Sequence, residues 1–186
     1  MEKLDLFKII LVQNFLNLSF KLYMLVKIYN LISFLGWILV MVFNQNLLLL
    51  QIIQSLAIFD VVLAFFKIIR TNYLIAFIQV LSRYFIVWGP LYISTEMPSF
   101  VLSMLALTWG LSDSVRYLYY YNPNIPFLKF LRYNLFWFLY PIGIAFEILS
   151  CYYSPLKSII IPIILIYLIF GFQLYYHMIM QNSKKN

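Results

Sequence analysis

Long apolar runs dominate the chain, and six of them reach the roughly 20 residues that a helix needs to cross the hydrocarbon core of a bilayer. Short connections that carry polar residues, proline or both separate them, as at residues 44–46, 95–98, 122–126 and 154–155. This pattern predicts one all-α domain over residues 1–186, a polytopic bundle without a soluble domain. The predicted transmembrane helices are residues 20–43, 47–67, 73–93, 99–120, 127–153 and 158–178.

Residues 1–19 differ from these runs because lysine, aspartate and amide side chains are interspersed among the apolar ones. No small-residue cleavage site follows, so a signal peptide is not indicated. The mixture predicts an amphipathic helix that lies in the membrane interface before the first span.

Basic residues are concentrated in every second connection, and this pattern predicts the orientation of the bundle in the membrane. The amino terminus, the second and fourth connections and the carboxyl terminus are basic, whereas the others carry little or no positive charge. Cytoplasmic ends of membrane helices hold the excess of Lys and Arg. Both termini are therefore expected in the cytosol.

The composition agrees with a multi-pass membrane protein, because 65% of the residues are hydrophobic and 10% are charged. The 13 Lys and Arg exceed the 6 acids but form no basic block, which argues against nucleic-acid binding. A single cysteine, Cys151, and a single histidine, His177, leave no plausible metal cluster and no internal disulfide. Lys157 follows Cys151 where a cysteine-phosphatase loop needs arginine, so that activity is excluded too.

The most informative stretch is Leu131–Glu147, where a carboxylate and a tyrosine interrupt an apolar run. At helical spacing, one stripe contains Arg132, Phe136, Tyr140, Gly143 and Glu147. Pro141 lacks a backbone donor and is expected to bend or open the helix one turn before it. The Cα atoms of Tyr140 and Glu147 would lie about 10 Å apart along a helix. Gly143 leaves space between these two side chains, and a substrate could fit there.

Each ionisable residue inside the other spans has either a role in function or a structural role in an ion pair. Asp60 is expected to pair with a basic neighbour, and Arg83 is a reasonable partner for Asp60 or Glu147. A polar stripe with helical spacing runs along residues 99–120. In this stripe Arg116 either pairs with Asp113 or faces a phosphate group of a ligand. The stripe consists of Trp109, Asp113, Arg116 and Tyr120.

Residues 109–147 and three shorter blocks of the chain resemble a known family. The segment Trp109–Glu147, WGLSDSVRYLYYYNPNIPFLKFLRYNLFWFLYPIGIAFE, is similar to the signature region of the very-long-chain 3-hydroxyacyl-CoA dehydratases, once called protein-tyrosine-phosphatase-like proteins. Three further blocks agree in order: YMLVKIYNLISFLGW (23–37), IQVLSRYF (78–85) and YYHMIMQ (175–181). The chain departs from the family pattern at Leu63, where histidine is usual, and at Asp113, where glutamate is usual.

The resemblance implies a six-span enzyme of the endoplasmic reticulum membrane that dehydrates long-chain (3R)-3-hydroxyacyl-CoA to trans-2-enoyl-CoA in fatty-acid elongation. It implies no cofactor, and other elongation enzymes and membrane lipid are expected partners. The catalytic tyrosine and glutamate of the family correspond to Tyr140 and Glu147. The expected substrate-binding or supporting residues are Asp60, Arg83, Asp113, Arg116, Tyr133 and Gly143.

The chemistry of these two side chains fits a dehydration. One group must take the proton from the α-carbon and another must protonate the departing β-hydroxyl, which a carboxylate and a phenol can do. We favour Glu147 as the base and Tyr140 as the acid, and the opposite order stays open. The acyl tail would lie between helices, with the CoA phosphates near the basic cytosolic connections.

The second hypothesis is a different class of function, in which the chain is a membrane protein without catalytic activity. It would be either a scaffold that binds elongation enzymes or a small-molecule channel, with Asp60, Arg83 and Glu147 as a buried network or an ion path. No run carries polar residues along its full length, as the lining of a pore would require.

Overall fold

The computed structural model describes residues 2–69, 71–155, 158 and 162, with side chains from residue 17 onward. Throughout this described part the regular elements are helices, which confirms the predicted all-α class. They are α1 (Glu2–Val42), α2 (Leu47–Leu56), α3 (Ile58–Phe65), α4 (Tyr73–Trp88), α5 (Pro90–Ile93), α6 (Ser99–Tyr121), α7 (Pro126–Asn134) and α8 (Phe136–Tyr152).

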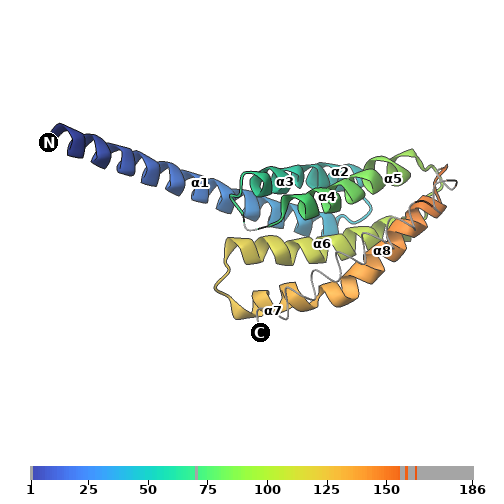
Figure 1. Cartoon of the computed structure of the whole chain (residues 1–186). Coiled ribbons are helices and arrows are strands. Elements are labelled where there is room, and N and C mark those ends of the chain that lie inside the picture. Colours follow the sequence, from blue (N-terminus) through green and yellow to red (C-terminus); the bar gives the residue numbers. More distant parts are fainter. Residues whose placement is uncertain (1, 70, 156–157, 159–161, 163–186) are drawn as a thin grey trace.

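The chain runs back and forth along one bundle, through α1, then α2 with α3, α4 with α5, α6, and α7 with α8 (Figure 1). Helix α6 lies centrally and packs against α1, α7 and α8. The connections α3–α4 and α6–α7 lie at one end of the bundle, whereas α1–α2 and α5–α6 lie at the other (Figure 1). The two basic connections therefore share one end.

Three stretches of the described residues are long and apolar enough to cross a membrane, Asn17–Val42, Leu47–Phe65 and Tyr73–Ile93. The bent pair of α7 and α8 is a fourth if both helices belong to one span. Helix α6 is 23 residues long but does not pass this test, because its inward polar stripe lowers its hydropathy. The predicted span 158–178 lies outside the described residues apart from two positions. The count of six spans and the cytosolic termini therefore stay predictions.

The predicted span 127–153 consists of two helices, because the chain breaks at Leu135 and bends by 43° between α7 and α8. The break precedes Pro141, which lies inside α8 and cannot donate to the carbonyl four residues earlier. The bend lies on the expected side of the proline but more than one turn away. Arg132 consequently lies on a different helix from Tyr140 and Glu147.

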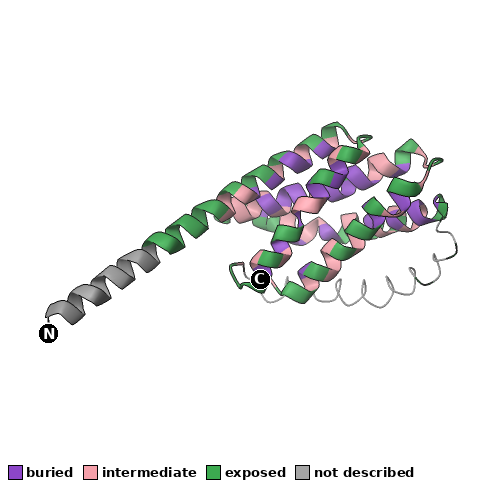
Figure 2. Ribbon diagram, turned by 90° about the horizontal axis from the view of Figure 1, so that it is seen from above, coloured by how far each residue is buried: buried purple, intermediate pink, exposed green. Residues whose placement is uncertain are grey.

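Helix α1 runs without interruption from Glu2 to Val42. Nothing in its backbone marks the expected boundary near residue 19, so the interfacial position of the first segment stays a prediction. At about 1.5 Å per residue a helix of 41 residues is longer than the bilayer core is thick. Its residues 17–25 are exposed and extend beyond the rest of the bundle (Figure 2).

The bundle buries polar groups and exposes apolar ones. Asp60, Asp113 and Glu147 are at most 7% exposed, whereas Phe65 and Phe138 are at least 62% exposed. Figure 2 shows exposed positions along the outer faces of the helices and buried ones between them. This distribution suits a protein whose outer surface meets lipid and whose ionisable groups lie inside the bundle.

Helices α1 and α6 pack against each other extensively, and Trp37, Val40, Leu105 and Trp109 belong to one buried core cluster. The contact depends on Gly110, because a Cβ atom there would collide with the side chain of Met41. Small residues at helix contacts allow such close approach in membranes.

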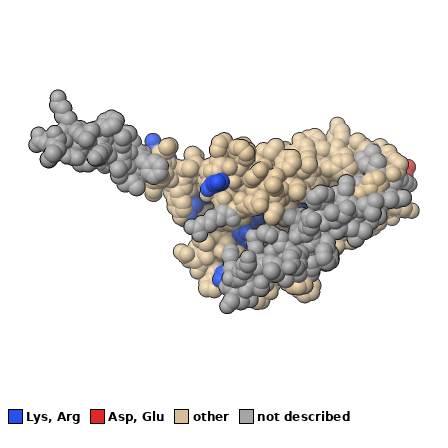
Figure 3. Space-filling view, in the orientation of Figure 1, with Lys and Arg blue, Asp and Glu red and all other residues tan. Residues whose placement is uncertain are grey.

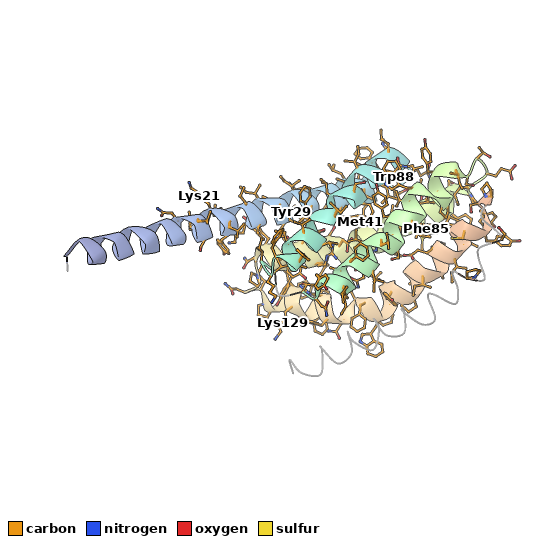
Figure 4. All side chains as sticks on the ribbon, turned by 45° about the horizontal axis from the view of Figure 1, so that its top comes forward. Lys21, Tyr29, Met41, Phe85, Trp88 and Lys129 are labelled. Atoms are coloured by element: carbon orange, nitrogen blue, oxygen red, sulfur yellow. The ribbon has the colours of Figure 1, made fainter. Side chains whose placement is uncertain are left out.

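Positive charge gathers at the end of the bundle with the basic connections. On the face shown in Figure 3, most of the visible Lys and Arg atoms lie toward this end, and acidic atoms lie at the opposite one. Lys21 on α1 and Lys129 on α7 lie toward this end, whereas Trp88 lies toward the other (Figure 4). Anionic groups of a ligand would be attracted to the basic end.

Candidate active site

The polar stripe predicted on residues 99–120 exists on α6, and each of its members contacts a different helix. Trp109 contacts α8, Asp113 contacts α4, Arg116 contacts α3 and Tyr120 contacts α7. The spacing of four, three and four residues keeps these side chains along one face of the helix. Through these four side chains α6 contacts α8, α4, α3 and α7.

Asp60 lies at the centre of a buried network. Its Oδ2 accepts from Arg116 Nη2 at 2.9 Å and from the Tyr117 hydroxyl at 2.7 Å, and its Oδ1 accepts from the Tyr29 hydroxyl at 2.9 Å. The predicted pairing of Asp60 with a basic residue is confirmed. Tyr29 and Tyr117 were missed, because nothing in the sequence separates them from the other tyrosines.

Arg116 also lies 3.6 Å from Asp113 Oδ1, within the helix itself. The ion-pair alternative for Arg116 is therefore confirmed, with Asp60 as the closer partner. A guanidinium between two carboxylates is already neutralised, so it is less suited to bind a phosphate.

Arg83 forms its ion pair with Asp113, with 2.6 Å between Nη1 and Oδ2. The predicted partners, Asp60 and Glu147, were wrong for this contact, because Asp60 is occupied by Arg116 and Asp113 projects from α6 toward α4. The Arg83 guanidinium also lies 5.3 Å from the ring centre of Trp109. Arg83 is still close enough to Glu147 to interact with it electrostatically.

Glu147 is 5% exposed and accepts a hydrogen bond from the indole Nε1 of Trp109 at 3.1 Å. Trp109 also occupies part of the space that Gly143 leaves open, since a Cβ atom on Gly143 would lie 3.8 Å from the same Nε1. The space between Tyr140 and Glu147 is therefore bordered by an indole ring. Sequence reasoning placed Trp109 in the stripe but did not connect it with Glu147.

Tyr140 is half-buried on α8, and its phenol interacts electrostatically with both Glu147 and Arg83. The structure thus brings together one phenol, one carboxylate and one guanidinium. The first two can exchange protons with a ligand, and the third can stabilise negative charge.

Arg132 does not join this group. Its Nη2 donates to the Tyr120 hydroxyl at 2.8 Å, and its guanidinium lies 4.3 Å from the Tyr120 ring centre and 4.9 Å from that of Tyr119. Tyr133, expected as a supporting residue, is 8% exposed, and Arg132 lies 5.7 Å from its ring centre. Arg132 therefore lies apart from the α8 part of the predicted stripe, whose catalytic role stays a prediction.

Among the described residues, no three His, Cys, Asp or Glu side chains lie close enough together to hold a metal ion. Cys151 is fully buried in the last turn of α8 and is not placed as a nucleophile.

The candidate site lies within the part of the chain that matches a known family. A family model described as protein tyrosine phosphatase-like protein, PTPLA, matches residues 54–186, a range that contains Asp60, Arg83, Tyr140 and Glu147. No solved structure matches the chain.

Several relatives cover most of the chain. The probable very-long-chain (3R)-3-hydroxyacyl-CoA dehydratase of Schizosaccharomyces pombe is 33% identical over 189 residues, which are 85% of this chain and 90% of the relative. The very-long-chain (3R)-3-hydroxyacyl-CoA dehydratase hpo-8 of Caenorhabditis elegans is 31% identical over 147 residues, 68% of this chain and 67% of the relative. The human very-long-chain (3R)-3-hydroxyacyl-CoA dehydratase 2 is 26% identical over 199 residues, 84% and 78% of the two chains. The chain therefore belongs to the protein tyrosine phosphatase-like family, the family of the very-long-chain (3R)-3-hydroxyacyl-CoA dehydratases.

Proposed function

We propose that this protein removes water from long-chain (3R)-3-hydroxyacyl-CoA to give trans-2-enoyl-CoA, as a lyase of fatty-acid elongation, and that Tyr140 and Glu147 carry the proton transfers. The names of its relatives support the reaction. The observation that carries the assignment of residues is that α8 carries both Tyr140 and the buried Glu147, near enough to each other and to Arg83 for their charges to interact.

In the proposed step Glu147 takes the proton from the α-carbon, and the electron pair of that C–H bond forms the double bond to the β-carbon. The C–O bond at the β-carbon breaks while Tyr140 gives its phenolic proton to the departing hydroxyl, which leaves as water. A proton then passes from Glu147 to the phenolate, which returns both groups to their starting forms. The reverse assignment of base and acid uses the same two positions.

Arg83 lies near both groups and bears a positive charge that Asp113 partly balances. Negative charge that develops on the phenolate or on the thioester oxygen would be stabilised by a fixed cation of this kind. Arg83 is therefore assigned an electrostatic role in the reaction and a structural one in its ion pair.

The substrate would lie with its acyl chain between the helices and its CoA phosphates at the basic end of the bundle. Exposed Lys67 and Lys129 lie in or beside the connections at that end and are free of any ion pair among the described residues. The proposal places the protein in the endoplasmic reticulum membrane with six spans and both termini in the cytosol, beside the other enzymes of elongation.

The direct test is to purify the full chain in detergent, supply a long-chain (3R)-3-hydroxyacyl-CoA and measure the enoyl product by chromatography. Formation of trans-2-enoyl-CoA supports the proposal, and the (3S) isomer serves as a substrate control. Folded protein that binds the substrate without forming product would favour the scaffold hypothesis instead.

A further inference from the structure

Trp109 lies inside the bundle, in direct contact with the candidate catalytic carboxylate. Tryptophans concentrate at the membrane interface, where the ring meets lipid and the N–H meets water. Trp109 is instead 2% exposed within α6, and its N–H donates to the carboxylate of Glu147. Trp37 is buried as well, whereas Trp88 and Trp137 are 41% and 42% exposed.

The indole of Trp109 contacts two other helices. Gly143 of α8 has no side chain, so the pyrrole edge lies against the helix that carries Glu147. The guanidinium of Arg83 on α4 lies 5.3 Å from the ring centre, within the range of a cation–π contact. Arg83 is fixed in turn by its 2.6 Å contact with Asp113, one helical turn after Trp109.

We propose that Trp109 is a positioning residue of the dehydratase, which orients the Glu147 carboxylate through its indole N–H while Arg83 and Asp113 hold the indole ring. This inference rests on the proposed function, in which Glu147 exchanges a proton with the substrate. Proton transfer from carbon requires the carboxylate to face the α-carbon, and a hydrogen bond to Oε1 fixes the rotation of the group about its last bond.

The reason for a tryptophan at this position follows from its chemistry. The indole N–H is a donor only, so it orients a carboxylate without competing for the proton that the carboxylate takes up. Its large ring fills the volume between α6 and α8, which a serine or threonine donor would leave open.

The experiment compares three proteins in detergent at saturating substrate. Trp109→Phe removes the N–H and reduces the ring. A second variant carries at position 109 a benzothienyl analogue of tryptophan, in which sulfur replaces the N–H and the ring shape is kept. Because misplacement of a reacting group by about 1 Å can cost on the order of 100-fold, we expect kcat to fall about 10- to 100-fold in both, with KM little changed.

Trp37→Phe is the matched control, because Trp37 is 0% exposed and lies on α1 in the same core, whereas Glu147 lies on α8. It should lower thermal stability while kcat per folded molecule stays near that of the wild type. A benzothienyl variant with wild-type kcat, beside an inactive Glu147→Gln, would overturn the inference on Trp109 alone. An active Glu147→Gln would overturn the proposed function itself.

A spectroscopic measurement tests the contact without activity. The chain has 4 tryptophans, so labelling the indole nitrogens with ¹⁵N gives 4 side-chain N–H signals, and Trp109→Phe identifies the one from Trp109. Glu147→Gln should shift that signal more than the others, because a charged acceptor is replaced by a neutral one. An unshifted signal would contradict the proposed hydrogen bond.

Discussion

Arg83 donates to Asp113 at 2.6 Å, and this contact joins α4 to α6 directly beside the indole of Trp109. Asp113 is 2% exposed, so the loss of its partner would leave a carboxylate buried near a single remaining cation, Arg116. The pair therefore matters for folding as well as for the site.

Arg83→Met should lower the free energy of unfolding by about 2–3 kcal/mol, somewhat less than for a fully buried pair because the Arg83 side chain is 23% exposed. The double change of Arg83→Met and Asp113→Leu should recover part of this loss, because no unpaired charge then remains. Thermal unfolding in detergent measures both effects. A double variant that is less stable than Arg83→Met would contradict this account.

Arg116→Ala should reduce stability and expression more than it changes KM for the acyl-CoA, because Arg116 lies between Asp60 and Asp113. This differs from a role in phosphate binding, which would raise KM in a stably folded protein. Lys129→Ala, at an exposed position near the same end, is the control for loss of positive charge. A folded Arg116→Ala protein with a strongly raised KM would restore the phosphate role.

Tyr140→Phe and Glu147→Gln should each lower kcat by about 100-fold or more with little change in KM, since each removes one proton-transfer group and almost no volume. The double variant should be little worse than the poorer single one if both groups act in one step. Tyr92→Phe and Glu96→Gln, both exposed near the other end of the bundle, are the matched controls. Multiplicative losses would indicate independent roles.

Gly110→Ala should destabilise the protein by about 1–3 kcal/mol, because the new Cβ atom would overlap the side chain of Met41. Met41→Ala should relieve the overlap, so the double variant should be more stable than Gly110→Ala alone. Gly143→Ala is the control, because its Cβ atom would make an ordinary contact of 3.8 Å with Trp109. Equal losses at the two glycines would contradict the close approach of α1 and α6.

The basic connections share one end of the bundle, and we expect both termini to lie with them in the cytosol. Protease treatment of intact microsomes should then remove tags from either terminus. Protection of only one tag would require an odd number of spans.

The pattern of apolar runs was sufficient for the all-α class and for most helix boundaries, because burial of backbone hydrogen bonds in a membrane leaves helices as the solution for such runs. The spacing of Trp109, Asp113, Arg116 and Tyr120 also predicted one polar face, since helical periodicity is local. The same local reasoning expected the bend one turn before Pro141, whereas the structure has it at Leu135.

What only the tertiary structure decided is which charges meet. Asp60 and Arg116 are 56 residues apart, and Trp109 and Glu147 are 38 residues apart, so no helical periodicity relates them. Their pairing depends on which helices are neighbours and how far each is rotated about its axis, and both follow from packing such as the contact of Gly110 with α1. The sequence by itself determined the helices and the residue types of the site, and the packing of those helices decided that Asp113 neutralises Arg83 and that an indole holds Glu147.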